Sequence, residues 1–345
     1  MAVRSTLDKS VTIIAVVVAA AAARLAGSVV APLALALFVI AIVWPLQSAL
    51  QSRLPALLAL AVTRLVTVAA CVAFASLAVW GFSRVGRSLI RDAARYQALY
   101  DTLILWLESH GLSIAGIWSE HFNVQWMLRA GQEITGRLNS TLSLGLITLV
   151  YATLGLLEIE PLRARVKGLA DQDMARALLG GCATTATKCR RYMLVRTQMS
   201  ALTGLFVGLF AWIAGLQFAV EWGVIAFALN YIPFIGSFVA TLLPTLIAMT
   251  QFQSWQAVVL LFACLNIIQF VIGSYIEPRV SGNVLAMSPL VVLFAILFWT
   301  FLWGLLGAFI GVPIAIAVLS FCEQHPSSRW IAELLGGGPP KIHST

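Results

Sequence analysis

The sequence predicts an all-α, polytopic membrane protein with about six spanning helices, two broken or re-entrant hairpin segments and an extracytoplasmic amphipathic helical region. Apolar residues make up 60% of the 345 residues and charged residues only 10%, whereas about 25% of the residues in soluble domains are charged. The mean hydropathy is +0.93. The apolar residues gather in runs long enough to cross a bilayer, which takes about 20 residues of helix. A water-soluble fold of this length could not bury so much apolar surface.

The net charge of +8 does not indicate nucleic-acid binding, because the Lys and Arg residues gather in the loops between the apolar runs. That distribution is typical of a membrane protein whose basic loops stay in the cytoplasm. The partner expected from composition is therefore the lipid bilayer, and no nucleic acid is expected.

Residues 1–82 are predicted to form the first three membrane helices. Gly27 and Ser28 make a tight link between the first two runs, which favours a helical hairpin. Because apolar sequence resumes directly after Gly27, we expect a retained first helix rather than a cleaved signal peptide. Arg64 lies inside the third run, where it either snorkels to the membrane surface or pairs with an acid. The runs lie near residues 11–26, 29–46 and 55–82.

Residues 83–140 form the only long stretch of mixed polarity. Apolar residues recur there at spacings of three and four, as at Leu89, Ala93 and Tyr96, which predicts amphipathic helices. We expect these helices outside the cytoplasm, on the membrane surface or against a neighbouring subunit. A buried apolar stripe in a small extramembrane domain is the alternative.

Residues 141–196 are expected to hold the fourth membrane helix and a basic segment that starts near Glu160. Basic residues far outnumber acidic ones in that segment, which marks it as cytoplasmic. With the amino terminus also inside, residues 83–140 fall outside and both chain termini are cytoplasmic. The tail of residues 323–345 is then a cytoplasmic segment.

Residues 197–322 are predicted to be a transport core built from two similar pairs of runs. In each pair an ordinary run is followed by an overlong, interrupted one, which is typical of inverted repeats in secondary transporters. If each overlong run is a re-entrant hairpin, the first enters from outside and the second from inside. The alternative is two long tilted helices with proline kinks. The four runs lie near residues 197–216, 219–249, 256–276 and 289–322.

The first overlong run is broken in its middle. Pro233 removes a backbone donor, Asn230 offers amide hydrogen bonds and Gly236 lets the backbone turn. Opened backbone inside a membrane is tolerated only beside a protein-enclosed or watery cavity, so these residues predict a binding site for a small polar solute. The second overlong run is interrupted by Gly304, Gly307, Gly311 and Pro313. Two of these, like Gly204 and Gly208, also have the GxxxG spacing that favours close helix contact.

Polar residues form a stripe along the run at 256–276, because Asn266, Gln269, Gly273 and Glu277 follow one another at helical spacing. Asn266 and Gln269 are candidates for solute contact or, equally, for hydrogen bonds between helices. Glu277, beside the helix-breaking Pro278, is a candidate for carrying a coupling proton, with an ordinary surface carboxylate as the alternative.

No pattern in the sequence indicates an enzyme. It lacks HExxH, GxSxG and a glycine-rich phosphate loop with Lys, and none of its four histidines lies in an apolar run. The five cysteines form no CxxC pair, so neither a metal site nor a cofactor is expected. Without an ATP-binding motif, active transport would draw on an ion gradient of protons or sodium. A pore or scaffold without coupled transport is the third possibility.

Four motifs in order resemble the AI-2E (autoinducer-2 exporter) family over about residues 195–320. They are NYIPFIG at 230–236, IEPRVSG at 276–282, Pro289-Leu290, and GLLGAFIGVP at 304–313. The resemblance implies a multi-pass bacterial inner-membrane protein, a homo-oligomer, that exports a small polar signalling molecule such as autoinducer-2; some relatives are assigned to sodium/proton antiport. Gly311 stands where the family pattern has Ala. The resemblance assigns importance to Asn230, Pro233, Gly236, Glu277, Pro278, Gly282, Pro289, Gly307 and Pro313.

Overall fold

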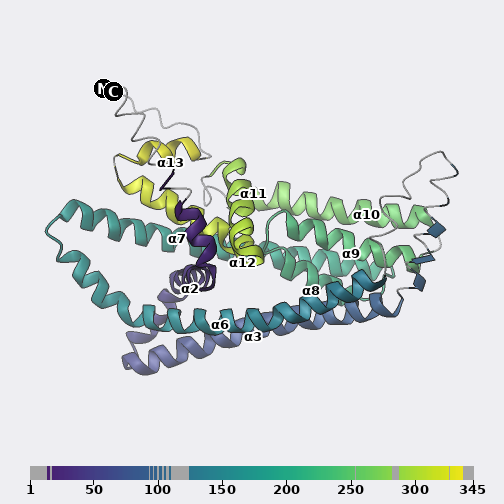
Figure 1. Cartoon of the computed structure of the whole chain (residues 1–345), viewed down its shortest axis with the longest axis horizontal. Coiled ribbons are helices and arrows are strands. Elements are labelled where there is room, and N and C mark those ends of the chain that lie inside the picture. Colours follow the sequence, from purple (N-terminus) through teal and green to yellow (C-terminus); the bar gives the residue numbers. More distant parts are fainter. Residues whose placement is uncertain are drawn as a thin grey trace. The chain divides into compact units, whose positions relative to one another are not determined.

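A computed structural model describes most of the chain, and its regular elements are all helices (Figure 1). The described residues are 14–15, 18–92, 124–252, 254–281, 287–325 and 327–336, with a few positions between 94 and 109; side chains of residues 124–143 are outside the description. The predicted all-α class is confirmed. The helices are α2 (Gly27–Gln51), α3 (Ala56–Arg91), α6 (Val124–Lys167), α7 (Gln172–Ile213), α8 (Ala219–Leu229), α9 (Ile235–Gln251), α10 (Trp255–Phe270), the π-helix η1 (Val271–Ile276), α11 (Glu277–Ser281), α12 (Pro289–Gln324) and α13 (Arg329–Leu335).

Six helical segments of the described chain are long and apolar enough to cross a membrane. About six spanning helices were predicted, so the number agrees, but the set of segments differs from the predicted one. The run at 11–26 is described only in part and is not among the six, whereas α12 is among them although it is bent. The six are Gly27–Gln51, Ala56–Arg91, Leu144–Lys167, Gln172–Ile213, Trp255–Val280 and Pro289–Gln324.

Three helices are longer than a bilayer requires. α3 has 36 residues, α6 has 44 and α7 has 42, and at 1.5 Å per residue even α3 spans about 54 Å, against roughly 30 Å of hydrocarbon. Each therefore continues as helix past the end of its apolar run. The predicted segment boundaries at residues 82, 140 and 196 lie inside these helices. Most of the amphipathic region between residues 93 and 123 lies outside the described residues.

The chain divides into two compact units, each described here by itself. The first unit contains α2 and α12, and the second contains α8, α9 and α10. The helices α3, α6 and α7 each contribute one part to either unit. The first unit comprises Met1–Thr67, Ser143–Leu194 and Ser281–Thr345, and the second comprises Val68–Leu142 and Val195–Val280.

In the first unit, α12 doubles back on itself as a helical hairpin. Its helical backbone is interrupted at Trp303 and at Gly304, where φ is 61° and ψ is −139°. A Cβ at Gly307 would overlap the carbonyl oxygen of Trp299, and one at Gly311 would lie 2.9 Å from that of Ala295. Gly311 comes four residues after Gly307, whereas its contact Ala295 comes four residues before Trp299, so the two arms run antiparallel.

The break involves fewer residues than the four that were predicted to cause it. Only Gly304 lies at the break itself, where its positive φ is a conformation that L side chains rarely adopt. Gly307 and Gly311 are in the second arm and permit its close approach to the first, which confirms their predicted role in helix contact. Pro313 is buried inside the second arm, which continues as helix to Gln324.

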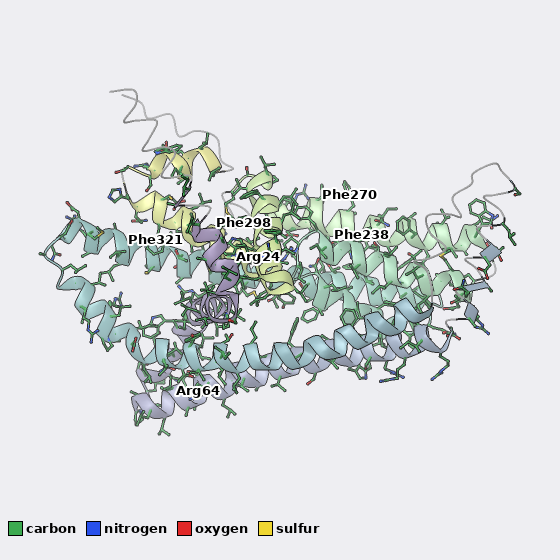
Figure 2. All side chains as sticks on the ribbon, viewed as in Figure 1. Arg24, Arg64, Phe238, Phe270, Phe298 and Phe321 are labelled. Atoms are coloured by element: carbon green, nitrogen blue, oxygen red, sulfur yellow. The ribbon has the colours of Figure 1, made fainter. Side chains whose placement is uncertain are left out.

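The tip of this hairpin is held by the end of the first apolar run. The indole nitrogen of Trp303 donates to the Ala23 carbonyl oxygen at 3.0 Å. The guanidinium of Arg24, which is labelled in Figure 2, lies 4.5 Å from the centre of the Phe301 ring, within cation–π range. Arg64, labelled in the same figure, is half-buried and makes no ion pair with any described residue, so the predicted acid partner is not found there.

In the second unit, α8 and α9 form another hairpin, and α9 also packs on α10 (Figure 1). The base of the hairpin is closed by Gln251, whose side chain donates to the Gly215 carbonyl oxygen at 2.6 Å and accepts from the Gln217 amide at 2.9 Å. At about 16 Å, the 11-residue α8 is too short to cross a bilayer alone. The expected broken segment is therefore a hairpin and not a long kinked helix.

The hairpin packs closely on the last five turns of α7. A Cβ at Gly204 would lie 2.6 Å from the Gly223 carbonyl oxygen, and one at Gly208 would lie 3.3 Å from the Gly223 Cα. This confirms the predicted close helix contact at these glycines. The fully buried Trp222, Ile225 and other apolar side chains of α8 to α10 form the core beneath it.

Candidate functional site

The tip of the α8–α9 hairpin is a tight turn that satisfies most of its own backbone. The Ile232 amide donates to the Leu229 carbonyl oxygen at 2.9 Å, taking the acceptor that Pro233 cannot use. The Gly236 amide donates to the Ile232 carbonyl oxygen at 2.9 Å. The turn is therefore less open than the sequence predicts, and its polar character comes mainly from side chains.

Gly236 has a different role from the one predicted. The positive φ of the turn falls on Phe234, at 63° with ψ of −55°, which is a strained conformation for a residue with a side chain. Gly236 lies in the first turn of α9, where a Cβ would overlap the Leu229 carbonyl oxygen. It is required for the close approach of α9 to the end of α8.

Side chains of the tip are bonded to α7. Asn230 is buried, and its amide nitrogen donates to the Ser200 hydroxyl at 3.3 Å. The Tyr231 hydroxyl donates to Thr197 at 3.1 Å, and its ring meets Phe74 and Phe227 edge-on. Asn230 is predicted from the sequence, but neither of these α7 partners is.

A stripe of buried polar side chains on α7 faces the hairpin. Arg196, Ser200 and Thr203 follow one another at spacings of four and three, so they share one helix face, and each is at most 6% exposed. The Arg196 Nε and the Thr203 hydroxyl find no hydrogen-bond partner in the described part of the chain. Because an unsatisfied buried polar group costs about 1–3 kcal/mol, such groups indicate a site for water or a polar ligand.

Arg196 also forms a buried ion pair with Glu277. Its Nη1 lies 2.7 Å from the Glu277 Oε1, with the two side chains 7% and 25% exposed. The apolar side chains of Val195, Met199 and Ile272 cluster beside the pair. Glu277 therefore has a specific partner, Arg196, which lies one turn of α7 before Ser200.

A π-helix carries Glu277 to this position. In η1 the Glu277 amide donates to the Ile272 carbonyl oxygen, five residues back. Pro278 cannot donate to the Ser274 carbonyl as an α-helix would require, and the wide turn accommodates its ring. Pro278 itself lies within α11 and does not end the helix. Gly282 lies outside the described residues.

The predicted polar stripe is not brought together as one surface. Asn266 is exposed and its amide donates to the Phe262 carbonyl oxygen of its own helix at 2.8 Å. Gln269 is half-buried and its Nε2 has no partner among the described residues. Gly273 lies in the π-helix, which changes the register between Gln269 and Glu277.

A second ion pair, with one buried and one exposed partner, was not anticipated. The Nη1 of Arg84 in α3 lies 2.7 Å from the Oε1 of Glu221, in the first turn of α8. Glu221 is the only charged residue between Arg196 and Glu277 in the sequence. A single acid in such an apolar stretch could have been recognised in the sequence as a candidate for a buried ion pair.

Nothing in the described part of the chain resembles a metal site, since no three His, Cys, Asp or Glu side chains gather there as ligands would. Three of the four histidines, His110, His121 and His343, lie outside the described residues.

Residues 13–327 match the family described as AI-2E family transporter. The AI-2 transport protein TqsA of Escherichia coli K12 is 29% identical over 318 residues, which cover 90% of either chain. The putative transport protein YhhT of the same strain is 35% identical over 150 residues, 44% of this chain and 43% of its own. A putative transport protein of Borreliella burgdorferi is 28% identical over 213 residues, 61% of this chain and 58% of its own.

Proposed function

The chain belongs to the AI-2E transporter family, and we propose that it is a secondary transporter that binds a small polar solute between the α8–α9 hairpin tip and α7. The observation that carries the proposal is the buried polar stripe at that tip. Arg196 and Thr203 each offer a polar atom that lacks a partner among the described residues, and Asn230 and Ser200 lie between them. Pro233 and Gly236 shape the turn that holds Asn230 there.

The proposed solute is a small polar signalling molecule of the autoinducer-2 type, exported with the help of an ion gradient. The name of the similar Escherichia coli protein supports this assignment. Glu277 is the proposed carrier of the coupling ion, because it is an ionisable group in direct contact with the stripe through Arg196. The setting is a bacterial inner membrane, with both termini cytoplasmic and the chain assembled as a homo-oligomer.

Two other functions are tested by the same experiments. Sodium/proton antiport would need the Arg196–Glu277 pair but no organic solute. A channel or scaffold would show no dependence on an ion gradient. Flux of candidate solutes and of sodium into sealed proteoliposomes, with and without an imposed pH gradient, separates the three.

Thr203→Val should lower transport without lowering stability. Valine has nearly the shape of threonine and lacks only the hydroxyl, which has no described partner. A hydroxyl with a purely structural role would have shown one, so its loss should leave the thermal unfolding midpoint in detergent unchanged or raised. We expect flux at low solute concentration to fall about tenfold, the effect of losing roughly 1.4 kcal/mol of binding.

Ser320→Ala, which removes another buried hydroxyl without a described partner in the other unit, is the matched control. Unchanged flux in Thr203→Val would remove the solute from this stripe.

Glu277→Gln should uncouple transport from the pH gradient. The amide keeps the size of the carboxylate and cannot exchange a proton at physiological pH, so solute binding should persist while gradient-driven accumulation is lost. The measurement is solute uptake at several imposed gradients, compared with equilibrium binding in detergent. Gradient dependence equal to that of the parent would make Glu277 a structural ion-pair partner only.

The proposed topology is tested at Ser281, the last residue of α11. If both hairpins re-enter the membrane, the loop that follows α11 faces the cytoplasm; if both overlong runs span it, that loop faces outside. Ser281→Cys, in a background without the five native cysteines, should resist a membrane-impermeant thiol reagent added to right-side-out vesicles. Gln253→Cys, two residues before the start of α10 in the sequence, should react. The reverse pattern would exclude the re-entrant topology.

A further inference from the structure

The base of the α8–α9 hairpin holds a carboxylate in an apolar environment. Glu221 lies in the first turn of α8 with its side chain only 7% exposed. Its neighbours Trp222, Ile225 and Ala226 are at most 1% exposed and belong to the apolar core of the unit. A charge in such surroundings persists only with a partner.

Arg84 is the partner, and it is the only one among the described residues. The part of α7 from Thr197 to Ile213, together with α9 and α10, contains no Asp, Glu, Lys, Arg or His. Arg87 and Arg91 of α3 are exposed and form no pair with Glu221. The charge of Glu221 therefore depends on one contact, the 2.7 Å pair with Arg84.

The two partners differ greatly in their access to solvent. Arg84 is 51% exposed, so it can remain charged and hydrated when it leaves Glu221. It also lies 5.6 Å from the ring centre of Trp80, within cation–π range. Glu221, with a side chain only 7% exposed, has little access to water and pairs with no second cation among the described residues. If α3 and α8 separate, the carboxylate must either stay charged without a partner or take up a proton, and the second course is far less costly.

We propose that Glu221 is a proton-binding site and that its pair with Arg84 is a latch between α3 and α8, which opens with the uptake of one proton. On opening, the Glu221 carboxylate takes one proton from water and becomes a neutral acid, while Arg84 keeps its charge. The latch lies at the base of the hairpin, whereas Glu277 and Asn230 lie at its tip. Its use in admitting a solute rests on the proposed transport function, but its existence does not.

Close packing between α3 and α8 lies beside the Arg84–Glu221 pair. Gly81 of α3 meets Val224 and Ile225 of α8 closely, since a Cβ there would lie 3.3 Å from either side chain. Val85, one turn further along α3, is 2% exposed and packs in the same core. A cysteine at position 85 is therefore protected while α3 and α8 stay together. Leu77, two turns back on α3, is 42% exposed and gives an accessible reference position.

The test is the rate of maleimide labelling of Val85→Cys in purified full-length protein, divided by that of Leu77→Cys, with the five native cysteines replaced. Because opening takes up one proton, the open fraction should rise as the pH is lowered from 8 to 5. Adding Glu221→Gln should give a high ratio that no longer changes with pH. A ratio independent of pH in the parent, a parent-like pH dependence in Glu221→Gln, or a low ratio in that variant would each overturn the latch.

A second measurement covers the case in which Val85→Cys fails to fold. Hydrogen exchange of the α8 amides, residues 219–229, is followed by mass spectrometry in the chain with native cysteines and corrected for intrinsic exchange rates. Protection of the α8 amides should decrease in the parent as the pH is lowered. In Glu221→Gln it should be low at every pH. Protection that is equal in the two proteins at every pH overturns the proposal. Neither readout involves flux, so failure of the latch and failure of the transport function are distinguishable.

Discussion

Replacing Glu277 by Ala should destabilise the protein by about 3–5 kcal/mol, the cost of leaving one member of a buried ion pair alone. The member left behind is Arg196, with a side chain only 7% exposed. Its guanidinium cannot lose its proton and has little access to water. We expect a marked fall in the thermal unfolding midpoint in detergent and in the yield of folded protein.

The reciprocal change should be milder, because Arg196→Met leaves behind the more exposed partner. Glu277 is 25% exposed, so water can reach it. The double variant Arg196→Met with Glu277→Ala removes both charges and should recover most of the stability lost in Glu277→Ala. Equal losses in the two single variants would contradict the role assigned to the different exposure of the partners. No recovery in the double variant would mean that the pair contributes no more than an exposed ion pair, which is worth at most about 1 kcal/mol.

The sequence identifies the hairpins well because their signals are local. Pro233 and Gly236 interrupt an apolar run, and Gly304 interrupts another, and the structure bends at both places. Composition alone was enough for the all-α membrane class, since no other fold accommodates such long apolar runs. Helix ends were harder to predict, because α3, α6 and α7 continue past the ends of their apolar runs, at positions where hydropathy falls but helix propensity does not.

The site was predicted only in part, because its other half comes from residues distant in the sequence. Asn230 was readable as a polar residue at a break, but its partner Ser200 is thirty residues away. Arg196 looked like the last residue of a basic loop, and only the packing of α7 on η1 shows it buried against Glu277. The stripe from Asn266 to Glu277 assumed an uninterrupted α-helix, an assumption that the π-helix before Pro278 invalidates.

Replacing Gly307 by Ala should be among the most damaging glycine-to-alanine changes in the described part of the chain. The new Cβ would overlap the Trp299 carbonyl oxygen, a backbone atom that no rotamer change can move. The arms of α12 must then separate along their whole contact, which also affects Gly311 against Ala295. Overpacking of this kind costs about 1–3 kcal/mol and more where the backbone must shift. The expected result is a lower thermal unfolding midpoint and loss of folded protein.

Gly145→Ala is the matched control for this substitution. Gly145 also lies inside a helix, α6, and has nothing within 4 Å of the position that a Cβ would occupy. The same change there removes only the conformational freedom of glycine, so it should stabilise the protein by roughly 0.5–1 kcal/mol. Gly236→Ala, which would overlap the Leu229 carbonyl oxygen, should behave like Gly307→Ala in the other hairpin. If Gly307→Ala and Gly145→Ala shift the unfolding midpoint in the same direction, the arms of α12 are not in backbone contact, and α12 is a kinked span rather than a hairpin.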